Sequence, residues 1–531
     1  MRKIVMGLVV VCLIGLISTG AWSQEKELVY GFPPAEKQAI LKAGVTPERE
    51  AYLKTKPYKG ITVTIAVNTA GREGPISGPL YLFGELWEQQ TGGKVEVIEI
   101  PYAECFQKVW IDLSTGAGKY DTVMAGAFWL GDLIANEYIE PLDKYMKDPR
   151  FPQWKTDTVS PAMKTLRTWG GKWYVVPNDA DGQVLYYRKD IMTNPEYKRR
   201  FWEKYGYELP IPPATWDELR DIAEFFNGWD WDNDGTVDYG IAMHLKVGGQ
   251  GMFHFESLSA PFVINPSNTR LWWFDPETME PLITSPGHLE ALKTLIELSK
   301  QGPRAALAWS LGEAWDCFLR GDAVLTFSWG DVGSLVQDVT KSRIKGKMGC
   351  VPLPGTLRSY DPIGKKWIGY KRPNIVGNTT GGSWAGPVFK QSKHPEATYD
   401  FLAFMATEPA NMWNATRGWT GVDPGRTFVF IKPYGPATTE DYVKRGWDAG
   451  DATEYSEGYY KNFYNPLMYP YLRIPGSVDY HNVLDIYLSE AVTGTVSPEE
   501  ALKKIYEEWE ETTDQLDREE QIKLYRESIG Y

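Results

Sequence analysis

Residues 170–191, GGKWYVVPNDADGQVLYYRKDI, decide the fold that is expected for this chain. Residues 173–176 have the composition of a strand that ends at Pro177, and residues 184–187 have that of a second strand. The polar, Gly-containing loop between them, residues 178–182, is unsuited to a buried core. Two strands joined through such a loop predict a crossover between two lobes, with the loop at the mouth of a cleft.

Length and composition indicate an acidic globular protein with more than one domain. The chain has 531 residues, of which 43% are hydrophobic and 24% charged, and its formal net charge is -13. This charge argues against nucleic acids and anionic membranes as partners, because both select basic patches. Many of the 22 Trp residues stand next to Gly, Asn, Asp or Ser, which predicts some exposed aromatic platforms beside a majority of packed rings.

The first 23 residues have the pattern of a secretory signal peptide. Arg2 and Lys3 precede an apolar run over residues 4–17, and small residues at Ala21 and Ser23 predict cleavage after Ser23. No later stretch approaches the ~18 to 20 apolar residues that span a bilayer, so we expect an exported, soluble protein. Three cysteines remain after cleavage, and we expect them to be buried thiols: Cys105, Cys317 and Cys350.

Strand and helix patterns alternate after residue 60. The strand pattern of residues 61–67 is followed by a helix pattern, and the same alternation repeats to about residue 130, which predicts an α/β fold with a mainly parallel sheet. Ligands bind beyond the carboxyl ends of the strands in such sheets. This rule indicates three groups of residues: Asn68 with Thr69, residues 126–129 with Trp129, and residues 178–182 with Asp179 and Asp181.

Residues 230–240, DWDNDGTVDYG, resemble the first part of a calcium-binding loop. Ile241 occupies the twelfth position, where an EF-hand has a bidentate Glu, so a plain Asp/Asn/Gly turn is the alternative. Closely spaced carboxylates repel one another without a cation. The prediction is a structural Ca²⁺ ion held by five residues: Asp230, Asp232, Asp234, Thr236 through its carbonyl, and Asp238.

Several segments in order then resemble one known family. Besides the crossover, they are PPATWDEL (212–219), RGDAVLTFSWGD (320–331), VPLPG (351–355), GGSWAGPVFKQSKHPEATYDFLAFM (381–405) and TGTVSPEEALKKI (493–505). In this order the chain resembles the extracellular solute-binding proteins of family 1, the maltose-binding-protein-like receptors of bacterial carbohydrate ABC importers. The resemblance covers about residues 60–510.

The resemblance implies a periplasmic-binding-protein-like fold, in which two discontinuous α/β lobes are joined by hinge strands around a ligand cleft. Residues 24–59 would form an N-terminal extension. The first lobe would contain residues 60–183 and 351–408, and the second lobe residues 184–350 and 409–531. The chain departs from the family pattern in this extension and in insertions near residues 192–210 and 420–475.

The resemblance also implies site residues of the kind that sugars require. A pyranose stacks its C–H faces on aromatic rings, and its hydroxyls need paired donors and acceptors. The positions that match the family's motifs offer stacking rings at Trp329, Trp384 and Trp129, and hydroxyl partners at Asp179, Asp181, Asn68 and Thr69. Tyr480 and Arg426 match further pocket positions. The alternative for each Trp is a place in the core of a lobe.

The function that the resemblance implies is that of an exported periplasmic receptor, monomeric and not an enzyme. It would capture a carbohydrate or polyol by lobe closure and deliver it to the membrane permease of an ABC importer. One alternative is a secreted carbohydrate-active enzyme, although hydrolysis needs two carboxylates about 5 to 10 Å apart across one bond, and Asp179 and Asp181 are poorly placed for that. Another is the same fold with a peptide or metal-ion ligand, which the adjacent Tyr186 and Tyr187 suggest for iron.

Overall fold

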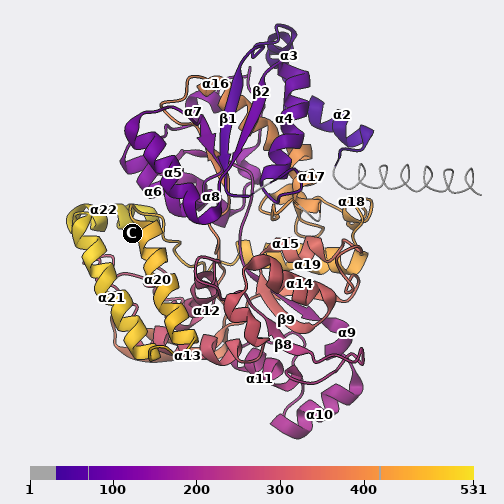
Figure 1. Cartoon of the computed structure of the whole chain (residues 1–531), viewed down its shortest axis with the longest axis vertical. Helices are drawn as coiled ribbons and strands as arrows, with labels where there is room; N and C mark the ends of the chain where they lie inside the picture. Colours follow the sequence, from indigo (N-terminus) through magenta and orange to yellow (C-terminus); the bar gives the residue numbers. More distant parts are fainter. Residues whose placement is uncertain (1–30, 70, 418–419) are drawn as a thin grey trace, which may run out of the picture.

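The computed structural model of the protein describes residues 31–69, 71–417 and 420–531. They form two α/β lobes, one above the other in Figure 1, with the last three helices at the left of the lower lobe. The predicted signal peptide, residues 1–23, lies outside the described residues, so its presence and cleavage stay predictions.

The first lobe is built on a parallel sheet. Strand β1 (Thr62–Val67) lies between β2 (Lys94–Glu99) and β3 (Thr122–Val123), and helices α4 (Ser77–Thr91) and α5 (Tyr102–Thr115) connect them. A bridge between Ala125 and Ala385 joins this sheet to β13 (Ala385–Pro387), which pairs antiparallel with β6 (Val175–Pro177). The predicted alternation of strand and helix is present here.

The second lobe is built on a mixed sheet in the order β10-β7-β9-β8. Strand β7 (Val184–Arg188) is buried along its whole length and runs antiparallel to β10 (Met348–Pro352) and β9 (Ala323–Ser328). Strand β8 (Tyr239–Ala242) is parallel to β9. Helix α11 (Trp216–Phe226) packs on β8 and begins with the predicted capping box of Thr215 and Glu218. Helices α14 (Leu311–Arg320) and α19 (Ala449–Phe463) also pack on this sheet.

Asn378 ties together three segments that lie between the lobes. Its Oδ1 accepts a hydrogen bond from the Gln183 backbone N–H at 2.7 Å, and its Nδ2 donates to the Gln183 carbonyl at 2.8 Å. Its own backbone N–H donates to Oδ1 of Asn462 at 2.9 Å. The crossover between β6 and β7, the return segment before β13 and the end of α19 are therefore held to one another.

The chain returns to the first lobe later than expected. Strands β11 (Thr356–Asp361) and β12 (Lys366–Asn374) form a hairpin that packs on α12 (Met252–Val263) of the second lobe. The Thr356 hydroxyl donates to the Pro261 carbonyl at 2.7 Å, and Nδ2 of Asn374 donates to the Ile264 carbonyl at 2.7 Å. Residues 356–374 thus lie with the second lobe, and the return follows Asn374 instead of beginning at residue 351.

The N-terminal extension is integrated into the first lobe. Helices α2 (Pro34–Lys42) and α3 (Pro47–Lys54) pack beside α17 (Glu408–Thr416) and α16 (Pro395–Met405), so the first lobe also continues beyond the expected boundary at residue 408. The fully buried Arg49 donates from Nη1 to Oδ2 of Asp400 at 2.6 Å. Tyr58 and Trp87 donate to the same carboxylate, at 3.2 and 2.8 Å.

Helices α20 (Ser477–Val492), α21 (Pro498–Gln515) and α22 (Arg518–Ile529) form the group along the side of the molecule (Figure 1). Helix α20 contacts α12 and α13 (Pro286–Ser299) of the second lobe and the turn η1 (Ala127–Trp129) of the first. The remaining elements are α6 (Leu130–Ala135), α7 (Asp143–Met146), η2 (Thr156–Thr158), α8 (Pro161–Arg167), β4 (Thr168–Trp169), β5 (Lys172–Trp173), α9 (Lys189–Met192), α10 (Pro195–Tyr205), η3 (Arg304–Ala308), α15 (Gly330–Leu335), η4 (Thr427–Val429) and α18 (Thr439–Val443).

Two further expectations concern the chain as a whole. Cys105, Cys317 and Cys350 are buried free thiols, as predicted. Over the residues that the structure describes, no helix combines the length and the apolar character needed to cross a membrane.

Candidate functional site

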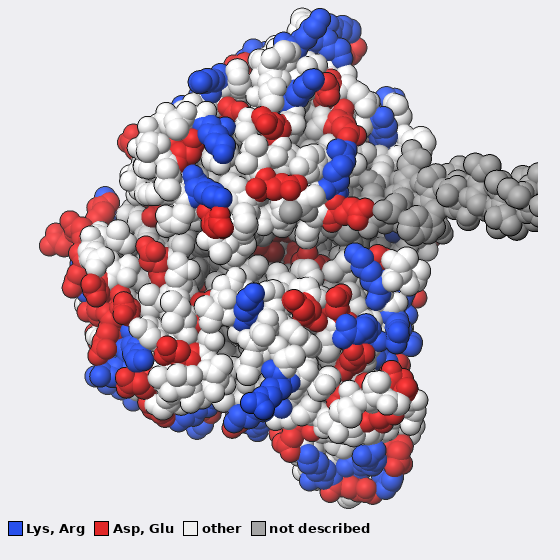
Figure 2. All heavy atoms as spheres, in the orientation of Figure 1, with Lys and Arg blue, Asp and Glu red and all other residues white. Residues whose placement is uncertain are grey.

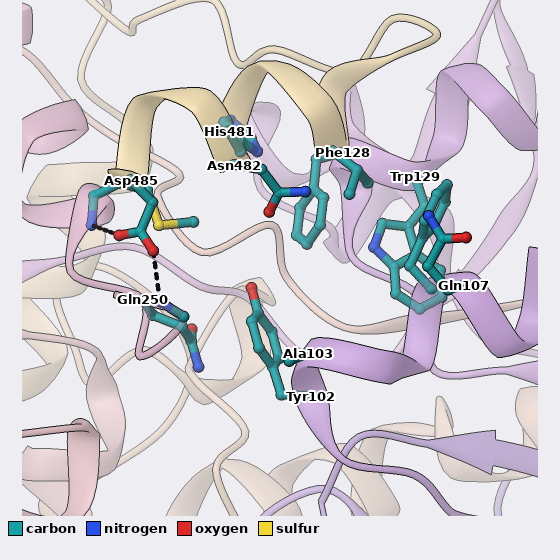
Figure 3. A pocket seen from close by; sticks show the side chains of 13 residues that line it. Tyr102, Ala103, Gln107, Phe128, Trp129, Gln250, His481, Asn482 and Asp485 are labelled. Carbon is teal, nitrogen blue, oxygen red and sulfur yellow. Dashed lines mark hydrogen bonds between the residues drawn. The ribbon is translucent and has the colours of Figure 1, made fainter. Parts of the chain in front are cut away.

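Two adjoining hollows lie between the lobes. The tryptophan hollow is lined by Asn68, Thr69, Pro75, Ile76, Tyr102, Asp181, Gln250, Leu311, Trp315, Trp329, Asp331, Trp384 and Gly421. The α20 hollow is lined by Tyr102, Ala103, Phe106, Gln107, Phe128, Trp129, Gly248, Gln250, Met252, Val478, His481, Asn482 and Asp485 (Figure 3). Tyr102 of the first lobe and Gln250 of the second border both hollows, so the hollows are neighbours, and together they are called the cleft. Gln250 has a φ of +72°, a strained conformation of the kind that occurs at functional sites.

Aromatic rings form the walls of the tryptophan hollow. Trp329 follows β9 and donates from Nε1 to the Thr380 carbonyl at 2.6 Å, which fixes the plane of its ring. Trp384 lies edge-to-face with Tyr102, with their ring centroids 6.2 Å apart. Trp315 comes from α14 and donates to the Ser328 hydroxyl at 2.8 Å. Hydrogen-bonded indoles of this kind present flat apolar faces at little further entropic cost.

Two carboxylates face the tryptophan hollow among these rings. Oδ2 of Asp181 accepts a hydrogen bond from the Ser383 backbone N–H at 2.7 Å. Burial, with the charge of Asp179 nearby, raises the pKa of Asp331 to about 7. Burial and the charges of neighbouring carboxylates also raise the pKa of Asp181 well above its ordinary value. Both side chains would gain from hydrogen-bond donors on a ligand.

Two further carboxylates lie behind this pair. Oδ1 of Asp179 accepts from the Asp423 backbone N–H at 2.8 Å, and Oδ2 of Asp423 accepts from the Gly330 N–H and from the Tyr459 hydroxyl, at 2.8 and 2.9 Å. Burial raises the pKa of both carboxyls. The buried Arg167 is the neighbouring cation, but its guanidinium donates to the Asp179 and Ser383 carbonyls, at 2.7 and 2.6 Å.

The first strand supplies Asn68 and Thr69, as its position predicts. Oδ1 of Asn68 is buried without a hydrogen-bond partner, although Asn68 lines the hollow. The Thr69 hydroxyl oxygen accepts from the Ser77 backbone N–H at 2.9 Å and so holds the start of α4. Asn68 therefore offers a free acceptor to a ligand, whereas Thr69 shapes the wall.

The α20 hollow combines one aromatic wall with polar groups. Trp129 comes from η1, and its ring lies edge-to-face with Phe106. Asp485 accepts from the Gly248 and Met252 N–H groups, at 2.6 and 3.3 Å, which connects α20 to the second lobe (Figure 3). Nε2 of His481 lies 2.9 Å from Oε1 of the buried Glu256.

Six of the nine predicted ligand residues line the cleft: Asn68, Thr69, Asp181, Trp329, Trp384 and Trp129. Asp179 lies behind Asp181. Arg426 instead donates to the Thr158 hydroxyl at 2.7 Å and the Ala406 carbonyl at 3.1 Å, and burial lowers its pKa to about 10. Tyr480 is fully buried and shares a hydrogen bond with the Thr513 hydroxyl at 2.8 Å, outside both hollows.

A family model described as "bacterial extracellular solute-binding protein" matches residues 76–412, which is more than half of the chain. The chain belongs to this family. The resemblance that its motifs indicate is therefore confirmed.

Relatives of this solute-binding protein include the mannitol-binding protein of Pseudomonas aeruginosa, which is 24% identical over 332 residues. That match covers 62% of this chain and 66% of the relative, just under two thirds of its length. A solute-binding protein of Agrobacterium radiobacter solved with ribitol has a TM-score of 0.63 and 19% identity, covering 84% of this chain and 98% of its own. Maltose-bound MalE3 of T. maritima has a TM-score of 0.62 and 23% identity, and the match covers 85% of this chain and 99% of that one. The predicted two-lobed fold is confirmed.

Several lining residues of this solute-binding protein were not predicted from the sequence, among them Tyr102, Gln250, Trp315, Asp331, His481 and Asp485. Two of them carried a usable signal. Tyr102 follows the carboxyl end of β2, and Asp331 stands two residues after Trp329 in the same motif. His481 is adjacent to Tyr480, and one helical step of ~100° moves a side chain from the buried face of α20 to the cleft. Gln250 lies in an irregular segment that has no strand or helix pattern.

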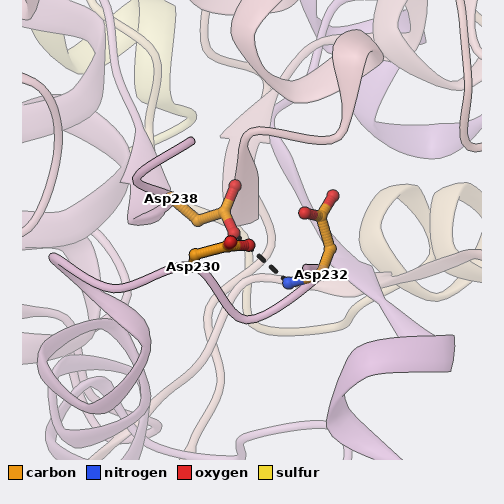
Figure 4. Close-up of side chains that lie close together, drawn as sticks. All are labelled: Asp230, Asp232 and Asp238. Atoms are coloured by element: carbon orange, nitrogen blue, oxygen red, sulfur yellow. Dashed lines mark hydrogen bonds between the residues drawn. The ribbon is translucent and has the colours of Figure 1, made fainter. Parts of the chain in front are cut away.

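The Asp-rich loop brings three of its predicted ligands together. Carboxylate oxygens of Asp230, Asp232 and Asp238 all lie within 4.8 Å of one another (Figure 4). Asp234 instead accepts hydrogen bonds from the backbone and hydroxyl of Thr236, at 2.8 and 2.6 Å. Burial raises the pKa of Asp238 to about 6. None of these residues lines the cleft of the solute-binding protein, and calcium binding stays a prediction.

Proposed function

We propose that this protein captures a carbohydrate or polyol in the tryptophan hollow and delivers it to the permease of an ABC importer. The observation that carries the proposal is the convergence of both lobes on one hollow. Asn68 and Trp384 come from the first lobe, Trp315 and Trp329 come from the second, and Asp181 comes from the crossover. Flat rings with hydrogen-bond acceptors between them match the alternating apolar and hydroxyl surfaces of a sugar.

The names of related proteins support the same ligand class. Mannitol, ribitol and maltose are named for the three proteins compared above. The structure of a solute-binding protein from Agrobacterium vitis, with a TM-score of 0.60 and 22% identity, contains D-mannitol. The proposal includes export through the signal peptide to the periplasm and a monomeric state, with closure of the lobes on the ligand as the step that the permease recognises.

The test is binding without turnover. The protein from residue 24 onward is mixed with mono-, di- and oligosaccharides and polyols, and its thermal midpoint and Trp fluorescence are measured while the sugars are assayed for breakdown. A ligand at about 1,000 times its Kd adds about 4 kcal/mol to the free energy of unfolding. A stabilising sugar that stays intact supports the proposal. Breakdown products would favour a hydrolase that uses Asp181 and Asp331, and binding of peptides or metal ions alone would contradict the carbohydrate assignment.

We also propose that Asp230, Asp232 and Asp238 hold a structural Ca²⁺ ion. The support is their mutual distance of at most 4.8 Å, together with the nearly complete burial of Asp238, which makes three negative charges costly without a cation. Calcium should raise the thermal midpoint of the protein over that measured with a chelator. An unchanged midpoint at millimolar calcium would contradict this proposal.

A further inference from the structure

The cleft is lined by acidic side chains and by no Lys or Arg among the described residues. The carboxyl side chains that line the two hollows belong to Asp181, Asp331 and Asp485. The one basic side chain in the lining, His481, already lies 2.9 Å from the carboxylate of Glu256. Figure 2 shows acidic atoms deep in the groove between the lobes.

The layer behind the tryptophan hollow increases this excess of charge. Asp179 and Asp423 are 3% and 2% exposed, and Oδ1 of Asp423 has no hydrogen-bond partner. The guanidinium of Arg167 is committed to two backbone carbonyls, so it offers these carboxylates only part of its charge. Four carboxyls that burial and mutual repulsion drive toward protonation thus surround one hollow.

The hollow also has the two other features that an ammonium group needs. Asn68 lines the hollow from the lobe opposite Asp331, and its buried Oδ1 has no hydrogen-bond partner. Indole faces, which attract cations through their negative quadrupole, are provided by Trp315, Trp329 and Trp384. A neutral sugar offers these carboxyls only hydroxyl donors, whereas an ammonium supplies three donors and a positive charge that favours their ionised form.

We infer that the ligand is a carbohydrate or polyol that carries a basic amine, with the ammonium placed among Asp181, Asp331 and Asn68 in the tryptophan hollow. This inference rests on the proposed function and narrows its ligand class. The same excess of charge excludes uronic acids, aldonic acids and sugar phosphates, because no cation in the lining would offset their charge.

The experiment uses triplets in which one carbon skeleton has a neutral, an amine and an acid form. They are glucose, glucosamine and glucuronate; galactose, galactosamine and galacturonate; and sorbitol, glucamine and gluconate. Calorimetric titration at pH 7 should find an amine that binds about tenfold tighter than its neutral parent, because charge-assisted hydrogen bonds are about twice as strong as neutral ones. The acid members should not bind.

A matched pair of variants locates the effect. Asp331→Asn should bring the amine and its neutral parent to similar affinities, while Asp316→Asn, which removes an exposed carboxylate from α14, should leave the tenfold ratio intact. The wild-type triplets provide the result even if Asp331→Asn does not fold. Neutral members that bind as tightly as their amines, or amines that all fail while neutral oligosaccharides bind, would overturn the inference and leave the proposed function standing. If no carbohydrate or polyol binds, both the inference and the proposed function are overturned.

Discussion

Asp331 holds its proton to higher pH in the folded protein than in the unfolded chain. Its pKa is raised from 3.8 to about 7, so between these values the folded state binds a proton that the unfolded state has released. Raising the pH through this window therefore lowers the free energy of unfolding. We predict that the thermal midpoint of the wild type falls between pH 4 and pH 7 relative to that of Asp331→Asn. A difference between the two midpoints that stays constant with pH would contradict this.

Trp315 is the wall residue whose loss should affect binding most selectively. It is partly buried, and its Nε1 bonds to Ser328, so Trp315→Ala removes a stacking face without opening the core of the lobe. We predict a loss of ligand affinity of about tenfold or more, as for aromatic anchors in binding pockets. The control is Trp202→Ala, which removes a 57% exposed ring on α10. Equal affinities of the two variants would show that Trp315 does not contact the ligand.

For single residues, the position along the chain predicted correctly which loops face the cleft. It was less successful in predicting which side chains of those segments line it. Asn68, Asp181 and Trp384 follow directly from strand ends and motifs, and all three line the cleft. Tyr480 does not line the cleft, because it lies on the face of α20 that packs on α21. The family resemblance predicted the helix but not which of its faces is turned toward the cleft. A pattern of residue types predicts that a helix forms, but it does not give the rotation of that helix about its axis relative to the neighbouring helices.

Helix α3 of the N-terminal extension is joined to the first lobe by a buried ion pair. Arg49 and Asp400 have fully buried side chains. Asp400→Ala would leave the guanidinium without its carboxylate, and we predict a loss of about 3–5 kcal/mol in the free energy of unfolding, measured with denaturant. The control is Glu50→Ala on the same helix, whose exposed pair with Lys54 is worth less than about 1 kcal/mol. A loss of unfolding free energy for Asp400→Ala as small as that for Glu50→Ala would mean that the contact of α3 contributes little to the stability of the lobe.

The Asp-rich loop gives a second prediction at the scale of an element. Asp238 belongs to the three-carboxylate group and Asp234 does not. Asp238→Asn should therefore abolish the rise in thermal midpoint with calcium, while Asp234→Asn, which removes a charge but keeps an oxygen that can accept from Thr236, should retain most of it. The reverse order of effects would show that the loop binds calcium in the EF-hand manner, with Asp234 as a ligand.

The sequence predicted the strands and helices of the sheets well and their grouping less well. Strand β1 and helix α11 have strong periodicity and clear ends, and both formed where expected. The hairpin of β11 and β12 was missed, because residues 355–378 are rich in Gly, Lys and Arg and lack alternation. Its place on α12 follows from contacts with residues about 100 positions away, which no local pattern contains.

For the whole molecule we predict a smaller radius of gyration when ligand is bound. Tyr102 and Gln250 belong to opposite lobes and border both hollows, so a ligand that touches both favours the closed arrangement. Small-angle scattering with and without the ligand measures this change. Gln250→Ala should weaken binding and leave the ligand-free scattering curve unchanged, and an identical radius with saturating ligand would contradict closure.

The ion pair between Arg49 and Asp400 has a consequence for how the chain folds during its synthesis. The two residues are 351 positions apart, and the rest of the first lobe likewise combines strands from the beginning of the chain with β13 and α16. This lobe cannot close its core until about three quarters of the polypeptide has left the ribosome, whereas the sheet of the second lobe is complete once β10 has emerged. Such late, distant contacts slow folding, and they keep the early part of the chain open for partners that act on unfolded polypeptides.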